Sequence, residues 1–332
     1  MNFSISSLVA CATLAIAGAA QADDYSVPKT SFGVPDLQGT WTSATITALQ
    51  RPPEIENLVI DEAEARVWED RFNGFFDSID DVPDGELEAG GDVGGYNSFW
   101  LDPGTRAMRV RGEIRSSILI SPENGKLPYR LGARAKLFAF FGRVGSAFDD
   151  PELRPLGERC IVGFGSTSGP PMLPVVYNNN YQIVQSPGYV MILVEMNHDA
   201  RVIRIDGEHL PDHMRPWMGD SIGHWADDTL VVETSNFHPG QSFRAGIKQQ
   251  LYLTKDAVVT ETFTRVSPTE IVYGFTVDDP GAYSETWSGE LSLRASEGQI
   301  YEYACHEGNY AMPGILAGAR REEAEAAAGG EE

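Results

Sequence analysis

Residues 181–205 read YQIVQSPGYVMILVEMNHDARVIRI, three short and mainly apolar runs separated by Pro187-Gly188 and by Asn197-His198-Asp199. Apolar runs bounded by turn-forming residues are typical of β-strands. Similar runs follow at 221–225, 229–234, 249–254, 257–265, 270–277, 287–294 and 299–305. Within residues 260–265 polar and apolar side chains alternate, which predicts a strand with one face in a core.

This series of short strands predicts a mostly β fold. We expect an antiparallel meander over residues 177–305 that forms either a lipocalin-like barrel or a sandwich, with a few peripheral helices. Parallel α/β folds are excluded, because helices do not alternate with these strands. The chain after its leader is long enough for one large β domain, and we predict a single β-rich domain over residues 23–320.

The part of this domain up to about residue 150 is predicted to be richer in helices and loops. Residues 39–42 resemble a short first strand, and a helix is expected after Arg51-Pro52-Pro53 with Asp61 as its cap. Its stripe at helical spacing consists of Ile60, Glu64, Val67, Trp68, Phe72 and Phe75. We then expect an acidic loop (78–95), strands (97–101 and 115–121) and a helix (132–141). Near the C-terminus, an alanine-rich helix precedes a disordered acidic tail at 321–332.

The first 22 residues have the features of an export signal. An apolar run from Leu8 to Ala20 is followed by Ala20-Gln21-Ala22, the small-x-small pattern that signal peptidase cleaves. Leu8-Val9-Ala10-Cys11 resembles a lipoprotein cleavage site, but cleavage there would leave almost no apolar run before the cysteine. We therefore expect a periplasmic or secreted protein whose mature chain begins near Asp23.

Charge and cysteine content narrow the classes of partner. The formal net charge is −23, which disfavours nucleic acid and anionic membranes because no basic stripe is present to bind phosphate groups. No later run is long enough to span a membrane. Cys160 and Cys305 are the two cysteines that follow the leader, and in an oxidising compartment they are expected to form a disulfide. Two buried thiols are the alternative.

Six strings spread over nearly the whole mature chain resemble a family of exported bacterial proteins. They are PDLQGTW (35–41), GERC (157–160), YNNNYQI (177–183), WMGDS (217–221), DTLVVET (228–234) and YEYACHEGNY (301–310). The family has no assigned reaction, so the resemblance implies export and no particular chemistry.

A second resemblance is to lipocalin-type barrels. These carry a Gly-x-Trp motif on the first strand of an antiparallel meander, and Gly39-Thr40-Trp41 lies at the corresponding end of this chain. The chain is much longer than a typical lipocalin. The resemblance favours the barrel over the sandwich and implies an interior that takes a hydrophobic or aromatic ligand.

A polar cluster around His198 supplies the first candidate site. Imidazole titrates near neutral pH, and His198 could act as a general acid or base if Glu195 or Asp206 orients it. Arg201 or Arg159 would then hold an anionic or carbonyl oxygen of the substrate. The structural alternative is that these residues form ordinary ion pairs on β-turns.

Two other catalytic patterns are weaker. His209 and His213 could hold a metal, but Pro211 between them prevents the helical presentation that zinc hydrolases use, so no metal site is predicted. Gly219-Asp220-Ser221-Ile222-Gly223 matches the nucleophile-elbow pattern, but a β-hairpin follows it in place of the required helix. A glycine-flanked turn is the simpler interpretation.

The predicted disulfide defines a second candidate site. A bond between Cys160 and Cys305 would bring His306 and Glu307 beside Glu158 and Arg159. Ion pairing on the surface is the alternative role for these four residues. Three consecutive amides, Asn178, Asn179 and Asn180, either form turns that start the next strand or donate hydrogen bonds to a ligand. We also include Arg159, Trp217, Ser221 and Tyr310 as ligand-binding candidates.

Two functions fit these residues. The first is an enzyme that performs metal-independent acid/base chemistry, such as hydrolysis, elimination, hydration or isomerisation, on a small hydrophobic or aromatic molecule in the barrel. The second is a binding or carrier protein that holds such a molecule without turnover. No dinucleotide or phosphate loop appears in the sequence, so no cofactor is predicted.

Overall fold

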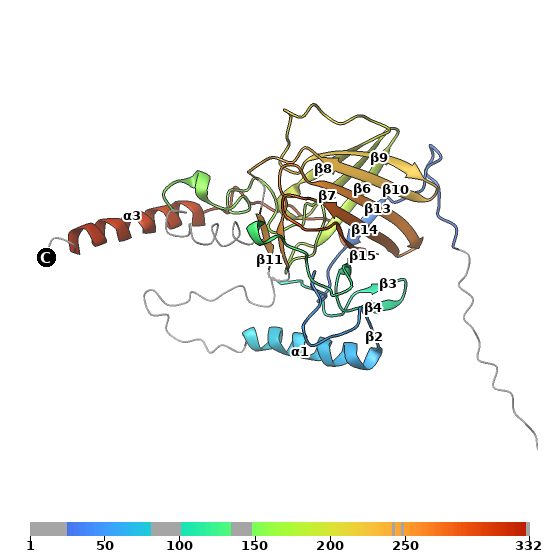
Figure 1. Ribbon diagram of the computed structural model, residues 1–332, viewed down its shortest axis with the longest axis horizontal. Coiled ribbons are helices and arrows are strands. Elements are labelled where there is room, and N and C mark those ends of the chain that lie inside the picture. Colours follow the sequence, from blue (N-terminus) through green and yellow to red (C-terminus); the bar gives the residue numbers. More distant parts are fainter. Residues whose placement is uncertain (1–24, 81–100, 134–147, 241–242, 247–248, 330–332) are drawn as a thin grey trace, which may run out of the picture.

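The computed structural model describes residues 25–80, 101–133, 148–240, 243–246 and 249–329 (Figure 1). Its centre is a closed nine-stranded barrel, which confirms the barrel and excludes the sandwich. The strands are, in barrel order, β1 (Gly39–Thr42), β6 (Asn180–Ser186), β7 (Tyr189–Val194), β8 (Ala200–Ile205), β9 (Asp220–Ala226), β10 (Thr229–Ser235), β13 (Val258–Ser267), β14 (Glu270–Asp278) and β15 (Trp287–Ala295). The barrel closes where Trp41 of β1 lies opposite Ala295 of β15.

One pair of strands departs from the predicted antiparallel meander. β8 and β9 run parallel, with Ile203 opposite Ser221, whereas every other neighbouring pair in the barrel is antiparallel. Parallel neighbours require a connection of about a dozen residues or more. Residues 206–219 supply it, because they carry the chain back to the end at which β8 began.

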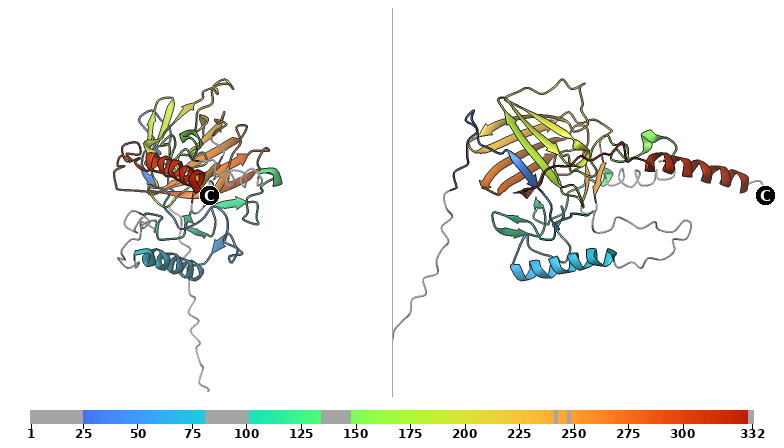
Figure 2. Two further views of the ribbon diagram at one scale, coloured as in Figure 1. Left: turned by 90° about the vertical axis from the view of Figure 1, so that its left-hand side faces the viewer. Right: turned by 180° about the vertical axis from the view of Figure 1, so that it is seen from behind.

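Smaller elements surround the barrel (Figure 2). β2 (Val59–Ile60), β3 (Arg109–Val110) and β4 (Glu113–Arg115) form a small sheet, and β5 (Leu119–Ser121) pairs with β15. β11 (Phe243–Gly246) and β12 (Gln249–Tyr252) form a separate hairpin. The described residues include the helices α1 (Glu62–Asp80) and α3 (Ala311–Gly329), and 3-10 turns at Pro151–Leu153 and Met196–His198. α1 lies beneath the barrel, and α3 projects from one end of it.

Several finer predictions fail. Residues 299–305 form no strand, and 249–254 contribute β12 to the outer hairpin and not to the barrel. Residues 321–329 belong to α3, whereas their composition predicted disorder. The expected leader, the loop at 78–95, the strand at 97–101 and the helix at 132–141 fall largely or wholly outside the described residues.

The barrel interior is filled by large side chains. Trp41, Tyr181, Phe263, Tyr273 and Trp287 are all almost fully buried and belong to one hydrophobic cluster. The indole nitrogen of Trp41 donates to the carbonyl of Leu37 (3.0 Å), and the guanidinium of Arg265 lies 5.4 Å from the Trp41 ring. The Gly-x-Trp motif therefore anchors the lead-in segment at the start of the barrel.

α1 begins as predicted at Asp61. The Asp61 carboxylate accepts from the backbone nitrogens of Ala63 (2.8 Å) and Glu64 (2.9 Å), and Glu64 accepts from the Asp61 nitrogen (3.1 Å). This reciprocal arrangement is a capping box. Trp68 and Phe72 pack on a second small core, whereas Val67 and Phe75 are exposed because they lie on other faces of the helix.

The Asp61 cap gives a first prediction. Asp61→Ala removes the acceptor for two backbone donors and should lower the free energy of unfolding by about 1 kcal/mol. Urea denaturation followed by circular dichroism would measure the loss. Asp70→Ala, in the middle of α1, is the matched control, and an equal loss in both variants would contradict a capping role.

Candidate functional site

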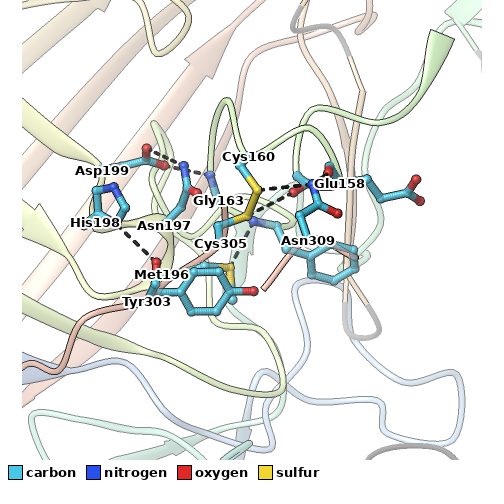
Figure 3. The surroundings of a disulfide bond; sticks show 12 residues. Glu158, Cys160, Gly163, Met196, Asn197, His198, Asp199, Tyr303, Cys305 and Asn309 are labelled. Atoms are coloured by element: carbon cyan, nitrogen blue, oxygen red, sulfur yellow. Dashed lines mark hydrogen bonds between the residues drawn. A yellow bond between two sulfur atoms is a disulfide. The ribbon is translucent and has the colours of Figure 1, made fainter. Parts of the chain in front are cut away.

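His198 lies in a strained turn at one end of the barrel. Both Asn197 (φ 60°) and His198 (φ 45°) adopt left-handed backbone conformations in the 3-10 turn that follows β7. The imidazole is exposed, and its Nδ1 lies 3.2 Å from the carbonyl oxygen of Tyr303 (Figure 3). The turn therefore joins the barrel to the segment that carries Cys305.

Asp199 holds this turn to the loop that follows Cys160. Its carboxylate accepts from the backbone nitrogen of Gly163 (2.7 Å), from the hydroxyl of Ser168 and from the amide of Asn197 (3.0 Å). Partial burial raises the pKa of the Asp199 carboxyl, and these hydrogen bonds offset part of that rise. With its oxygens engaged in this way, Asp199 orients the loop and not the His198 ring.

The predicted disulfide is confirmed. Cys160 and Cys305 are bonded, and their Cα atoms lie 5.7 Å apart. Asn309 reinforces the junction by donating to the carbonyl of Glu158 (2.7 Å), as Figure 3 shows. A bond across 145 positions thus fixes the C-terminal segment against the loop that leads into the barrel.

The charged residues expected at this junction face other partners. Arg159 pairs with Glu152 (2.7 Å), and Glu158 pairs with Arg154 (2.7 Å). The side chains of His306 and Glu307 are exposed, and Tyr310 is 85% exposed. The disulfide brings the segments together, but it does not gather these residues around one point.

A pocket of about 440 Å³ opens beside the disulfide. Its lining joins the loop after Gly157, the C-terminal segment and the first turns of α3: Gly157, Glu158, Phe164, Tyr177, Tyr303, Ala304, Cys305, Gly308, Asn309, Ala311, Met312 and Ile315. The volume lies in the range of small-molecule sites, and aromatic and aliphatic side chains predominate. Neither His198 nor His306 is among these lining residues.

A second polar cluster lies inside the barrel. Both terminal nitrogens of Arg201 on β8 donate to the carboxylate of Glu261 on β13, at 3.0 and 2.6 Å. The side chains are only 2% and 0% exposed. Arg201 was predicted to hold an oxygen of the substrate, and in the structure it holds the carboxylate of Glu261.

Neighbouring hydroxyl groups complete this cluster. The hydroxyl of Tyr273 donates to Glu261 (2.7 Å) and accepts from the nitrogen of Met172 (2.9 Å). Ser221 exchanges a hydrogen bond with Thr234 (2.8 Å). Burial, followed by the charge of Glu261, raises the pKa of Tyr273 well above its usual value, so the phenol stays neutral. Burial opposes the charge of Arg201, but Glu261 outweighs it and raises the pKa of the guanidinium.

The three consecutive amides have different positions. Asn179 is fully buried, accepts from the nitrogen of Val175 (2.8 Å) and donates to the carbonyl of Asp102 (3.0 Å). Asn180 donates to the carboxylate of Glu195 (2.8 Å), and Asn178 adopts a left-handed conformation. These contacts organise the chain at the start of β6.

The remaining candidates are dispersed. Asp206 follows β8 in a left-handed conformation, and its nitrogen donates to the carbonyl of Gly223. Trp217 packs against His238 with ring centroids 3.9 Å apart and the ring planes tilted. Ser221 points into the barrel beside Thr234, on a strand, so the elbow pattern does not form an exposed nucleophile.

His209 lies between two carboxylates, and its neighbourhood does not resemble a metal centre. Its two ring nitrogens lie 2.9 Å from Asp220 and 3.1 Å from Glu233. Asp220 also accepts hydrogen bonds from both terminal nitrogens of Arg204. Burial acts to raise the pKa of the Asp220 carboxyl, but the hydrogen bonds from Arg204, Leu210 and His209 together outweigh burial and lower it. Within the described part of the chain, no group of three or more His, Cys, Asp or Glu side chains is placed to hold a metal ion.

Comparisons with known proteins found no matching family model, no matching curated protein and no matching solved structure. Over the described ranges, the structure contains no helix that is both long and apolar enough to cross a bilayer.

Glu261 was not among the predicted site residues, although the sequence pattern around it indicates a core position. In residues 259–263 Glu261 shares its face with Val259 and Phe263, both of which point into the core. A carboxylate at a core position needs a buried partner. Arg201 shows the same alternation on β8: it is buried, whereas its neighbours Ala200 and Val202 are exposed.

Proposed function

We propose that the protein is an exported binding or carrier protein that holds a small, mainly apolar molecule in the pocket beside the Cys160–Cys305 disulfide. The observation that carries this proposal is the pocket lining, which includes Phe164, Tyr303, Met312 and Ile315 and has no histidine. An acid/base enzyme needs a titrating group that is free to reach its substrate, whereas a binding protein needs only complementary surface. The carboxylate in the lining, Glu158, has both oxygens engaged by Arg154, at 2.8 and 3.0 Å.

The disulfide supports both the proposed cellular compartment and the proposed binding role. Disulfides persist in oxidising compartments, which agrees with a periplasmic or secreted protein. The bond also contributes Cys305 to the pocket wall and fixes the neighbouring segment. A wall held covalently loses little conformational freedom on binding, and this preorganisation favours affinity.

A charge placed in the pocket wall should weaken binding. Ile315→Glu puts a carboxylate against the apolar ligand, and the cost of desolvating that group should weaken binding at least about tenfold. The neutral probe N-phenyl-1-naphthylamine, whose fluorescence rises in apolar surroundings, provides the measurement. Ala324→Glu makes the same change on an exposed part of α3 and should leave the titration unchanged. Equal binding by the two variants would contradict the proposed pocket.

The enzyme hypothesis has one supporting contact, which is the hydrogen bond between His198 and the carbonyl of the pocket residue Tyr303. His198→Ala separates the two functions. A binding protein should retain its affinity and convert no bound compound. Conversion of a bound compound by the wild type, lost about a hundredfold or more in the variant, would establish catalysis in its place.

A further inference from the structure

Arg244 is a buried arginine that lacks a full set of partners. It belongs to β11 of the outer hairpin, at the end of the barrel from which α3 projects (Figure 1), and it is only 5% exposed. Its Nη1 donates to the carbonyl of Pro170 (3.0 Å) and to the hydroxyl of Ser166 (3.3 Å). Its Nε and Nη2 are buried, and no acceptor among the described residues reaches them.

The charge balance around Arg244 is uneven. The charge of Arg201 repels that of Arg244, and the charge of Glu261 attracts it. Glu261 is already engaged by both terminal nitrogens of Arg201. Burial, followed by repulsion from Arg201, lowers the pKa of Arg244 to about 9, so the group remains charged at neutral pH. The hydrogen bonds of Arg244 go to two neutral acceptors, Ser166 and Pro170, and no described carboxylate forms a salt bridge with it.

The two unpartnered nitrogens define the shape of the missing group. Nε and Nη2 are neighbours on one edge of the planar guanidinium, with their N–H bonds nearly parallel. That edge matches the two oxygens of a carboxylate in a bidentate contact. A single guanidinium with one free edge favours a monoanion over a dianion such as phosphate.

The surroundings favour an organic acid over an inorganic ion. The ring of Phe237 lies 6.0 Å from the guanidinium, and Leu251, fully buried, stands opposite Arg244 in the hairpin. Apolar neighbours stabilise a hydrocarbon body and strengthen a charged contact by excluding water.

We propose that Arg244 binds the carboxylate of a small organic monoanion at this end of the barrel. The site is separate from the pocket beside the disulfide, since none of its residues lines that pocket. It adds an anion-recognition function to a protein whose own net charge of −23 repels anions. Selective binding of an anion by this protein therefore depends on a buried, preorganised arginine.

The experiment uses acetate, benzoate, octanoate and succinate with the full folded protein at constant ionic strength. Thermal unfolding and isothermal titration calorimetry are measured for each compound, with sodium sulfate as the inorganic comparison. We expect saturable stabilisation by at least one monocarboxylate, and weaker effects from succinate and sulfate. A ligand present at a hundredfold excess over its Kd should give a clear rise in Tm.

Substitutions of Arg244 test whether this side chain binds the carboxylate. Arg244→Met removes the fork at similar length and should abolish the saturable effect, whereas Arg244→Lys keeps a charge without the fork and should weaken binding about tenfold. Arg320→Met, which removes an exposed arginine from α3, is the control for overall charge and should bind as the wild type does. Arg244→Lys and the wild-type titrations provide the test if Arg244→Met does not fold.

The outcomes distinguish this site from the pocket. Arg244→Met or Arg244→Lys should still bind N-phenyl-1-naphthylamine, and Ile315→Glu should still respond to the carboxylate. Saturable binding that survives in both Arg244 variants would overturn the proposal. So would a wild-type protein that none of the three monocarboxylates stabilises, or one that responds equally to sulfate.

Discussion

Glu261→Ala should lower the free energy of unfolding by about 3 to 5 kcal/mol, measured by urea denaturation. The substitution removes the carboxylate that both terminal nitrogens of Arg201 contact and leaves that charge buried beside Arg244. An unpartnered buried charge costs far more than the pair contributes, because the desolvation penalty is no longer offset. Tyr273 also loses the acceptor of its hydroxyl group.

A double variant separates this cause from a general packing defect. Arg201→Met combined with Glu261→Leu removes both charges and keeps most of the volume, so it should be more stable than Glu261→Ala. The two sites contact each other, so their effects should not be additive. A double variant as unstable as the sum of its single substitutions would show that the ion pair is not the reason for the loss.

Local pattern predicted most of the barrel strands but not their directions. The alternation in residues 260–265 predicted β13, and the cap at Asp61 predicted the start of α1. The parallel pairing of β8 with β9 was not predictable, because residues 206–219 are long enough to return the chain to either end. Direction is determined by the closure of the barrel, which depends on contacts far apart in sequence.

Parts of the candidate site were predictable where few partners or positions were possible for a residue. Cys160 and Cys305 are the two cysteines that follow the expected leader, so their pairing could be predicted, and the structure confirms it. The alternation along its strand was enough to place Glu261 on the core face. Its partner Arg201 could not be predicted, because the pairing depends on the strand order that brings β8 and β13 around one interior. The burial of Arg244 could not be predicted from the sequence, because its contacts with Ser166 and Pro170 span more than 70 positions.

Replacing Cys160 and Cys305 together by serine should lower the free energy of unfolding by about 4 to 5 kcal/mol. The bond spans 145 positions, and closing so long a loop strongly reduces the entropy of the unfolded chain. The double variant should also bind N-phenyl-1-naphthylamine more weakly, because the segment around Cys305 forms one wall of the pocket. Reduction of the wild type should reproduce both losses, whereas the same reductant should leave the double variant unchanged. A reduced wild type that kept its stability while losing the probe would show that the bond serves the pocket alone and contributes nothing to folding.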